Sequence, residues 1–454
     1  MSETGISVEA EFGELAIQHL QALLRIDTTN PPGNETAAAE YLAEVLRKEG
    51  IEPTLVGVSA DRKNVLARLK GGDGSKGPLL LCAHLDVVPV ELEHWTHPPF
   101  GGVIADGFLW GRGAIDMKHM AVMSVLTLIR LKREGYKLDR DVIFAGVADE
   151  EAGCEQGSKW LVVNHPDLVR AEFALGEAGA FSVYSNGVEL YPIQVAEKGV
   201  VWFRMKARGT PGHGSMPRED NAVGRLSRAV AALASTRLPH HRTPVVEAYL
   251  GALAATQPAP RSWLIRNLWT RAIANLVLGK MPDRGVANAI AAALSNTAVP
   301  TMLRAGQKVN VIPGEAEAEV DGRTLPGQTT ADFLREVQQV VGEEIELAVT
   351  RELPPVETSP ESQLFDVLKA TLKQHAPAGT AIPYMAPGFT DAKSWAELGC
   401  RCYGFEPVRF SPDDPKFSEL FHGHNERIPI AGLKWGTTVL FEAVRRFVVP
   451  TPTP

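Results

Sequence analysis

Three apolar stretches of the chain have the length expected of buried strands. They cover residues 79–83, 142–148 and 173–176, and none of them contains a charged side chain. Short apolar runs bounded by polar or glycine-rich segments are typical of strands inside an α/β sheet. We therefore expect these three stretches to form the centre of a sheet.

Apolar residues at helical spacing occupy much of the chain around these strands. The helices that this spacing predicts cover residues 12–25, 35–49, 120–133, 361–375 and 431–447. Further strands are expected at residues 64–69 and 402–405, and a hairpin at 103–110 has Asp106 and Gly107 at its turn. Strands that alternate with helices in this way indicate an α/β domain.

A second pattern begins near residue 197, where half-buried strands alternate with amphipathic helices. The strands are expected at residues 200–206, 315–323 and 345–349, and the helices at 221–233 and 330–341. Strand, helix, two strands, helix, strand is the order of a ferredoxin-like sandwich. We therefore expect a first domain made of residues 1–195 and 355–454, with a second domain at 196–354 inserted into it.

The segment at residues 237–297 interrupts this second pattern. It is rich in alanine and leucine and contains Trp263 and Trp269, so we expect it to be helical. Its apolar faces must pack on something. An added helical layer or a contact between subunits would account for them.

Length and charge limit the class of protein. A chain of 454 residues exceeds the size of a single hydrophobic core, which supports two domains. The net charge is -8, and lysine and arginine are scattered among acids, so we expect no nucleic-acid partner.

Several features bear on the compartment. Residues 1–12 carry three glutamates and no basic segment followed by an apolar one, so we expect no export signal. No apolar stretch is long enough to span a bilayer, and we expect no membrane insertion. Four cysteines without a Cys-x-x-Cys pair are too few for a disulfide framework. The sequence favours a cytoplasmic protein.

Each of the three apolar strands is followed at once by side chains that can bind a cation. These side chains are His84 and Asp86 after the first strand, Asp149, Glu150 and Glu151 after the second, and Glu177 after the third. Ligands of open α/β sheets bind at the carboxyl ends of the strands. Three consecutive acids repel one another unless a cation lies between them. The sequence therefore predicts a cation site at this edge of the sheet.

His84 and Asp86 can act as a pair. Residues two apart in an extended chain point to the same side, so Asp86 can accept a hydrogen bond from one ring nitrogen of His84 while the other nitrogen binds a metal. Asp116 precedes the predicted helix at 120–133, in a loop that contains Gly111 and Gly113. An Asp at this position is often an N-cap, but two nearby glycines also permit the backbone to approach a bound ion.

Six motifs spread over nearly the whole chain contain these candidate residues. In chain order they are His84-Leu85-Asp86-Val87-Val88-Pro89, Gly111-Arg112-Gly113-Ala114-Ile115-Asp116-Met117-Lys118, Asp149-Glu150-Glu151, Glu177-Ala178-Gly179, Gly212-His213-Gly214-Ser215 and His422-Gly423-His424-Asn425-Glu426. Their residues and their order resemble those of the M20 family of metallopeptidases, which includes glutamate carboxypeptidase, succinyl-diaminopimelate desuccinylase, acetylornithine deacetylase, aminoacylase and the Gly-X carboxypeptidases. The segment at 237–297 departs from the pattern and resembles the longer members.

The resemblance implies a fold and a metal site. The fold would be a zinc-exopeptidase-like three-layer catalytic domain with an inserted ferredoxin-like α+β domain that serves as a lid or dimerisation domain, so a homodimer is possible. Asp116 would bridge two metals, with His84 and Glu177 completing one set of ligands and Glu151 and His422 the other. The ions would be two Zn²⁺, although nitrogen and oxygen ligands also permit Co²⁺ or Mn²⁺. The peptide bond between Asp116 and Met117 is expected to be cis.

Further residues take roles through the same resemblance. Glu150 would be the general acid and base, and His213 would donate a hydrogen bond to the oxyanion. Asp86, as the partner of His84, is counted with them among the catalytic residues. The substrate contacts would be Arg323, which would bind a carboxylate, with Asn310, Gly388 and Thr390. Since these residues belong to two domains, closure would assemble the site. His424 is expected at the surface or behind the ligands.

The function implied is hydrolysis of an amide bond next to a free carboxylate in a small peptide, as in a carboxypeptidase or dipeptidase. The alternative substrate is an N-acyl amino acid, because a deacylase uses the same chemistry and only the pocket on the acyl side differs. A non-catalytic binding relative would be expected to lack Glu150 or a metal ligand, and all of them are present.

Overall fold

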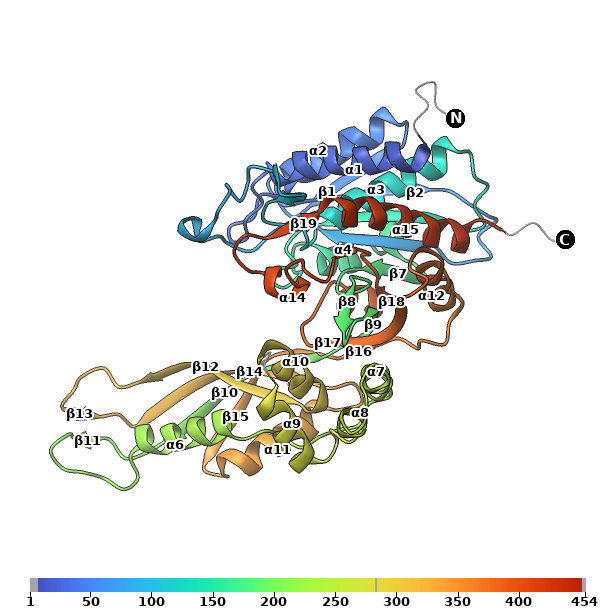
Figure 1. Cartoon of the computed structure of the whole chain (residues 1–454). Coiled ribbons are helices and arrows are strands. Elements are labelled where there is room, and N and C mark those ends of the chain that lie inside the picture. Colours follow the sequence, from blue (N-terminus) through green and yellow to red (C-terminus); the bar gives the residue numbers. More distant parts are fainter. Residues whose placement is uncertain (1–6, 282–283, 451–454) are drawn as a thin grey trace. The chain divides into compact units, whose positions relative to one another are not determined.

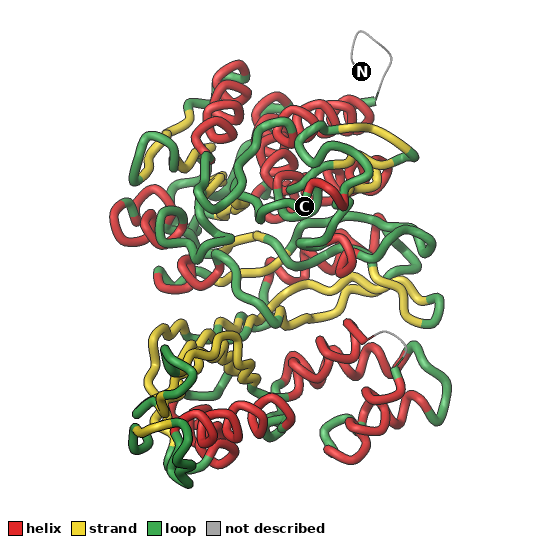
Figure 2. The backbone as a smooth tube through the Cα atoms, turned by 90° about the vertical axis from the view of Figure 1, so that its left-hand side faces the viewer, coloured by secondary structure: helices red, strands yellow, loops and turns green. Residues whose placement is uncertain are grey.

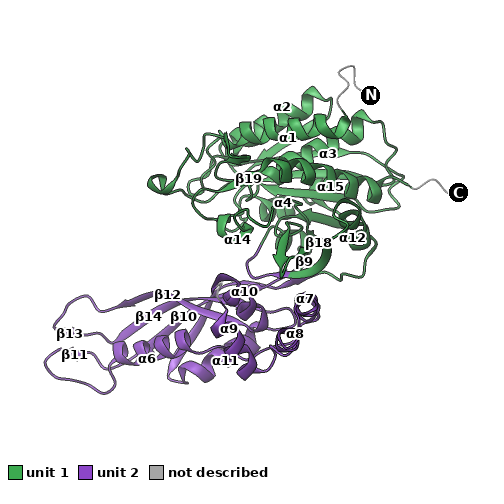
Figure 3. Ribbon diagram, viewed as in Figure 1, with its two compact units in different colours: residues 1–195, 358–384, 390–454 green, residues 196–357, 385–389 purple. Residues whose placement is uncertain are grey.

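The computed structural model describes residues 7–281 and 284–450 of the chain (Figure 1). They form two compact units, which Figure 3 colours separately. Unit 1 comprises the described residues up to Val195, Thr358–Tyr384 and those from Thr390 onward, and unit 2 comprises Ala196–Glu357 and Met385–Phe389. Residues 1–6 of the acidic start, on which the expectation about export partly rests, lie outside the described residues.

Unit 1 is built on a mixed sheet. Its strands lie in the order β1 (Pro53–Gly57), β2 (Lys63–Leu69), β6 (Val142–Val147), β3 (Leu79–His84), β7 (Phe173–Gly176), β18 (Arg401–Gly404) and β9 (Val188–Glu197). β8 (Val183–Ser185) and β17 (Thr380–Ala386) also pair with β9, and β16 (Val356–Glu357) pairs with the end of β9 that belongs to unit 2. The three apolar stretches predicted to be central strands are β3, β6 and β7.

The middle of this sheet is parallel. β3 pairs in parallel with β6 and β7, and β18 pairs in parallel with β7. His84 lies opposite Val147, and Gly404 lies opposite Gly176. The carboxyl ends of all four strands therefore meet at one edge of the sheet, and the α/β fold class predicted from the sequence is confirmed.

Helices cover both faces of the sheet. α1 (Val8–Leu24), α2 (Glu35–Lys48), α3 (Lys118–Arg133) and α15 (Ile430–Val448) form one layer, which appears above the sheet in Figure 1. α4 (Ser158–Asn164), α5 (Pro166–Val169) and α13 (Ala392–Glu397) cover the other face, where Trp395 and Leu161 pack on Leu80 and Cys82. α12 (Gln363–His375) packs against α15. The strand core is buried on both sides, as uniformly apolar strands require.

A small sheet and several short elements complete unit 1. β19 (Arg427–Pro429), β5 (Phe108–Trp110) and β4 (Val103–Ala105) pair in that order, and Asp106 and Gly107 form the predicted turn of the hairpin. A short 3-10 helix (Leu92–His94) and α14 (Phe417–Leu420) lie in the loops. β19 leads directly from the polar loop that carries His422 into α15.

Unit 2 contains a four-stranded antiparallel sheet with the order β12 (Thr297–Ala305), β14 (Glu315–Thr324), β10 (Gly199–Arg208), β15 (Ile345–Leu353). α6 (Ala222–Ser235) and α11 (Thr330–Val341) pack on one face through a core that includes Phe203, Leu226 and Phe333. The order along the chain is strand, helix, two strands, helix, strand, as in a ferredoxin-like sandwich. β11 (Gly212–His213) and β13 (Val311–Ile312) form a separate pair.

The described part of the segment at residues 237–297 contains the helices α7 (Pro244–Ala255), α8 (Arg261–Arg266), α9 (Arg271–Lys280) and α10 (Arg284–Leu294). In Figure 2 they are red parts of the backbone tube, like the other helices. Residues 282–283 lie outside the described part. The buried Lys198 Nζ donates hydrogen bonds to the carbonyls of Ala292 and Ser295 at 3.0 and 2.9 Å, so the end of α10 is fixed to the start of β10. Among the described helices of the chain, none has the length and apolar character to cross a bilayer.

Candidate metal centre and active site

The carboxyl edge of the parallel strands brings the predicted metal ligands together. His84 is the last residue of β3, Glu151 lies in the loop after β6, and Glu177 follows β7. Asp116 comes from the loop before α3, and His422 from the loop before β19. Within the described residues, two groups have the spacing of metal ligands: one consists of His84, Asp116 and Glu177, the other of Asp116, Glu151 and His422.

Asp116 is common to both groups. His84 Nε2 lies 3.0 Å from Asp116 Oδ1 and 3.9 Å from Glu177 Oε2. His422 Nε2 lies 2.9 Å from Asp116 Oδ2 and 3.2 Å from Glu151 Oε2. The two carboxylate oxygens of Asp116 therefore face two different histidines, which is the arrangement of a bridging ligand.

The protonation behaviour of these groups reflects an excess of negative charge. Burial would lower the pKa of His422, but hydrogen bonds with Asp116 and Glu151 outweigh it and raise that pKa to about 10. Burial also acts against protonation of His84, yet its contacts with Asp116 and Asp86 raise its pKa well above the usual value. Burial raises the pKa of Glu177 and of Glu151. Each of these shifts favours added positive charge in the site.

The donor set fits a metal ion. Glu151 Oε1 and Glu177 Oε1 are buried without a hydrogen-bond partner among the described residues. A buried carboxylate oxygen without a partner is costly, and metal coordination would remove that cost. Ligand atoms on a tetrahedral zinc ion lie roughly 3.3 Å apart, given bonds of about 2.0 Å. The separations between the candidate ligand atoms, 3.0 and 3.9 Å in one group and 2.9 and 3.2 Å in the other, are compatible with that spacing.

Zinc is expected to stabilise the folded protein, because the carboxylates would otherwise repel one another. At a free zinc concentration 100 times the dissociation constant, the gain in unfolding free energy should be about 2.7 kcal/mol. Thermal unfolding with zinc and with a chelator measures this, and magnesium, which prefers oxygen ligands, serves as the control ion. An unfolding temperature that is the same with zinc and with chelator would refute the metal site.

Asp86 fixes the backbone of the two glutamates. Its carboxylate accepts hydrogen bonds from the amide nitrogens of Glu150 and Glu151, both at 3.1 Å. The expected bond between the Asp86 carboxylate and His84 is long, at 3.5 Å, whereas the backbone carbonyl of Asp86 lies 3.0 Å from His84 Nδ1. The closer acceptor for His84 is thus the carbonyl, because the carboxylate is turned toward the loop after β6.

Glu150 lies beside the metal groups without belonging to either of them. It is buried, and burial together with the charge of Glu177 raises its pKa well above the usual value. A carboxylate with a raised pKa can both accept and return a proton near neutral pH. The structure therefore gives the two adjacent glutamates different surroundings.

Glu426, in the same motif as His422, anchors the Asp116 loop. Its carboxylate is fully buried and accepts hydrogen bonds from the amides of Gly113, Ile115 and Asp116 at 3.0, 2.8 and 3.2 Å, and from Arg112 Nη1 at 2.7 Å. The sequence motif contained Glu426, but nothing in it assigned this role. The peptide bond between Asp116 and Met117 is cis, which confirms the prediction.

The fourth parallel strand is also followed by an acid. Glu406 follows β18, is buried, and accepts a hydrogen bond from the amide of Ala178 at 2.7 Å. It also lies 3.5 Å from His119 Nε2. Glu406 was not among the predicted site residues. It follows a predicted strand just as Glu177 does, and this position was the available signal.

His424 lies at the surface, where its Nε2 is 3.0 Å from Glu91 Oε2 and its ring stacks on His94. It is therefore not part of the ligand groups. His422, in contrast, has a left-handed backbone with a φ of 55°. A non-glycine residue in this region stores strain, and such residues cluster at functional sites.

The remaining candidates belong mainly to unit 2. His213 in β11 lies opposite Val311 in β13, so the strand pair brings it close to Asn310, whose carbonyl accepts a bond from Gly214 at 2.9 Å. Arg323 lies at the end of β14. Gly388 is exposed in unit 2, whereas Thr390 is buried in unit 1, where its hydroxyl accepts from the amide of Ala392 at 3.1 Å.

Comparison of sequences identifies the family. The pattern of peptidase family M20/M25/M40 matches residues 80–446. The N-fatty-acyl-amino acid synthase/hydrolase PM20D1 of Mus musculus is 30% identical over 464 residues, which cover 96% of this chain and 90% of that protein. Aminoacylase-1 of Sus scrofa is 35% identical over 217 residues, covering 47% of this chain and 52% of that protein.

Solved structures share the fold. The M20 family metallo-carboxypeptidase Sso-CP2 from Sulfolobus solfataricus has a TM-score of 0.69 at 18% identity, covering 97% of this chain and 99% of that chain. Human carnosine dipeptidase 1 has a TM-score of 0.63 at 16% identity, with coverage of 96% and 97%. The resemblance drawn from the motifs is confirmed, and the chain belongs to the peptidase family M20/M25/M40.

Proposed function

We propose that this protein is a metal-dependent hydrolase that cleaves an amide bond next to a free carboxylate. The observation that carries the proposal is the pair of ligand groups that share Asp116, with the unligated Glu150 beside them. The ligands would be His84, Asp116 and Glu177 for one ion and Asp116, Glu151 and His422 for the other. We propose two zinc ions, and cobalt or manganese would suit the same donors.

The chemistry can be divided between the metal and the chain. Bound zinc would lower the pKa of water and polarise the scissile carbonyl. Glu150 takes the proton of the attacking water and returns it to the leaving amine. Asp86 holds Glu150 in place through the amide of that residue.

The contacts of His213 favour the tautomer that can donate to an oxyanion. Its Nδ1 lies 3.2 Å from the amide nitrogen of Ser215, which can only donate, and 2.7 Å from the Ser215 hydroxyl, which can also donate, so Nδ1 can accept from both. In the neutral ring the proton is then on Nε2. That exposed N–H supports the proposed role of His213 as a donor to the tetrahedral intermediate. The roles of His213 and Arg323 require unit 2 to act as a lid during catalysis.

Arg323 is already partly engaged by a neighbouring acid. Its Nε and Nη2 donate to the two oxygens of Asp321 at 2.7 and 3.1 Å, while Nη1 is buried and has no hydrogen-bond partner in the described part of the chain. Asp321 thereby orients the guanidinium, and Nη1 is the atom left to bind a carboxylate of the substrate. The Arg323 guanidinium lies over the ring of Phe389, with Cζ 6.0 Å from the ring centroid.

Arg323→Ala is expected to act on recognition of the substrate carboxylate. Loss of one charged hydrogen bond costs roughly 1.5 to 3 kcal/mol, which corresponds to a fall in kcat/KM of about ten- to a hundred-fold. The fall should be much smaller for amides of the same substrates. His213→Ala is the matched comparison and should slow acid and amide substrates alike. An equal penalty for both substrate classes in Arg323→Ala would show that Arg323 does not bind the carboxylate.

Two substrate classes contain this bond, and both have support. Small peptides fit the fold shared with the carboxypeptidase and the carnosine dipeptidase. N-acyl amino acids are favoured by the similarity to PM20D1, named as an N-fatty-acyl-amino acid synthase/hydrolase, over 96% of this chain. A panel of dipeptides and of N-acyl amino acids with short and long acyl chains, tested with zinc-loaded protein, separates the two. Absence of hydrolysis throughout the panel would refute the proposed function.

A further inference from the structure

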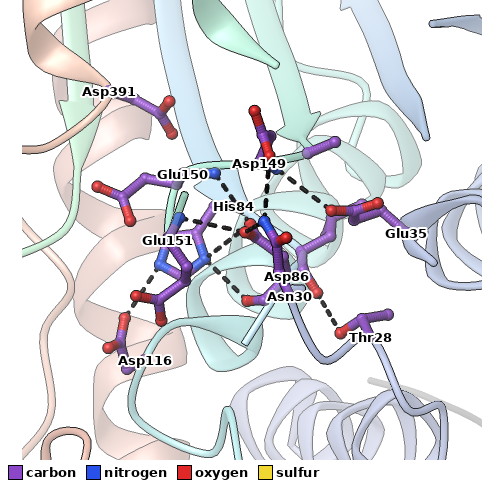
Figure 4. Close-up of polar contacts among 12 residues, drawn as sticks. Thr28, Asn30, Glu35, His84, Asp86, Asp116, Asp149, Glu150, Glu151 and Asp391 are labelled. Atoms are coloured by element: carbon purple, nitrogen blue, oxygen red, sulfur yellow. Dashed lines mark hydrogen bonds and ion pairs between the residues drawn. The ribbon is translucent and has the colours of Figure 1, made fainter. Parts of the chain in front are cut away.

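Asn30 connects two buried acids that lie behind the catalytic glutamates. Its side-chain amide nitrogen donates to Asp86 Oδ2 at 2.8 Å and to Asp149 Oδ1 at 3.1 Å (Figure 4). Asn30, Asp86 and Asp149 are each at most 5% exposed. Carboxylates this close and this deeply buried require a donor between them, and Asn30 supplies it.

Arg62 provides the positive charge of the same cluster. Its Nε and Nη2 donate to the two carboxylate oxygens of Glu35 at 2.6 and 2.8 Å, and Nη2 also donates to Asp149 Oδ1 at 2.7 Å. Nη1 donates to the carbonyl of Pro32 at 2.9 Å. Arg62 is only 8% exposed and Glu35 is fully buried. The guanidinium is therefore held by the start of α2, the loop before it and the loop after β6.

The chain makes room for this guanidinium. A Cβ atom on Gly33 would lie 2.3 Å from Cζ of Arg62, and Gly33 has a φ of +85°. Only glycine combines this backbone conformation with such a close approach. The loop before α2 is thus shaped around Arg62.

Both acids reach the catalytic residues through the backbone. Asp149 immediately precedes Glu150, has a left-handed φ of 69°, and accepts a hydrogen bond from the amide of Gln156 at 3.0 Å through Oδ2. Asp86 holds the amides of Glu150 and Glu151. The carboxylate of Asp86 therefore fixes the amides of Glu150 and Glu151, and the carboxylate of Asp149 ties the residue before them to Gln156.

We propose that Asn30, Arg62 and Glu35 form a positioning network that sets the direction of Glu150 and Glu151 by holding Asp149 and Asp86. None of the three touches the candidate ligand atoms, so they act through these two acids. The inference rests on the proposed function for the roles of Glu150 and Glu151. Residues that orient metal ligands from behind typically change metal affinity or activity by about 10- to 100-fold when they are replaced.

The test compares Asn30→Ala with three arginine variants. Asn30→Ala removes both bridging hydrogen bonds, and Arg62→Met removes the charge. Arg130→Met is the matched control, because Arg130 is 7% exposed and pairs with Glu134 and Glu9 at 2.6 and 3.1 Å. Arg130 lies in the last turn of α3, roughly 18 Å along the helix from Lys118. Arg62→Lys restores the charge without the planar fork.

Three measurements are made on each variant. They are zinc affinity by competition with a chromogenic chelator, kcat and KM separately, and hydrogen exchange of a peptide that contains the amides of Glu150 and Glu151. Asn30→Ala is expected to weaken zinc binding or lower kcat by about 10- to 100-fold, with KM nearly unchanged, and to speed exchange of that peptide. Arg62→Met should do the same, and Arg62→Lys should recover part of the loss. Arg130→Met should lower only the unfolding temperature.

The proposal fails if Asn30→Ala keeps zinc affinity, kcat and peptide exchange within about twofold of the parent protein, or if it matches Arg130→Met in every measurement. If Arg62→Met does not fold, the measurements on Asn30→Ala alone test the proposal. Zinc affinity and exchange do not depend on a substrate. A parent protein that hydrolyses nothing would therefore refute the proposed function while leaving the network open to test.

Discussion

Glu150→Gln is expected to lower kcat by about 10² to 10⁴-fold while the protein keeps its zinc. The amide has the shape of the carboxylate but cannot accept the proton of the attacking water. Glu150 lies outside both ligand groups, so its replacement removes no metal ligand. The measurements are kcat for the best substrate of the panel and zinc content by elemental analysis, after identical preparation of parent and variant.

Glu151→Gln is the matched control, since it makes the same chemical change one residue further along. Glu151 Oε2 lies 3.2 Å from His422 Nε2 in the second ligand group, so this variant should lose zinc as well as activity. If both variants lost the same amount of zinc, the division of labour between the two glutamates would be wrong.

Asp116→Asn is expected to have the largest effect on metal content, because Asp116 is the one residue common to the two ligand groups. A neutral amide is a weaker ligand, and both ions should be lost or greatly weakened. Metal polarisation of the reacting carbonyl is worth several kcal/mol, so kcat/KM should fall by about 10³-fold or more. Zinc content per protein and kcat/KM are measured together.

Glu177→Gln provides the comparison for this loss. Glu177 belongs to one group only, beside His84, so this variant should retain the ion held by Asp116, Glu151 and His422. A loss of zinc from Asp116→Asn no greater than that from Glu177→Gln would contradict the bridging role. Each protein is dialysed against the same chelator-free buffer before analysis, so that only bound zinc is counted.

The candidate ligands on the parallel strands could be placed at one edge of the sheet from the sequence, because their signal is local. His84 and Glu177 each follow a short apolar run, and the pairing of β3 with β7 leaves their ends at the same edge. The sequence pattern alone places the acids there. Asp116 and His422 lie in loops without periodicity, and only the resemblance connected them with the strand ends.

The parts that escaped prediction depend on polar residues that are buried in pairs. β9 was missed because Glu189 and Pro192 interrupt its apolar pattern, yet the strand is almost wholly buried. Glu189 is satisfied by Arg409 and by the Tyr191 hydroxyl, both at 2.8 Å. Arg409 lies 220 residues from Glu189, so a window of sequence around the strand does not reveal this arginine partner.

The same limit applies to the site. Arg62 precedes a predicted strand, and nothing near it in the sequence indicates a buried guanidinium. Its partners Glu35 and Asp149 are 27 and 87 residues away. Glu426, whose carboxylate accepts a hydrogen bond from the amide of Asp116, lies 310 residues after Asp116 in the chain. Pairs of residues this far apart in the chain are brought together by the fold, so they cannot be predicted from the sequence until the fold is known.

The spread of the two ligand groups along the chain has a consequence for the order in which the centre can form during synthesis. His84, Asp116 and Glu177 have all been made once residue 177 is added, whereas the second group waits for His422, 306 residues after Asp116. The 245 residues from Glu177 to His422 take roughly 12 to 50 s to add at translation rates of about 5 to 20 residues per second. The growing chain therefore contains the three residues of one group well before the other group is complete, whereas Glu426, whose carboxylate anchors the Asp116 loop, is made only after His422.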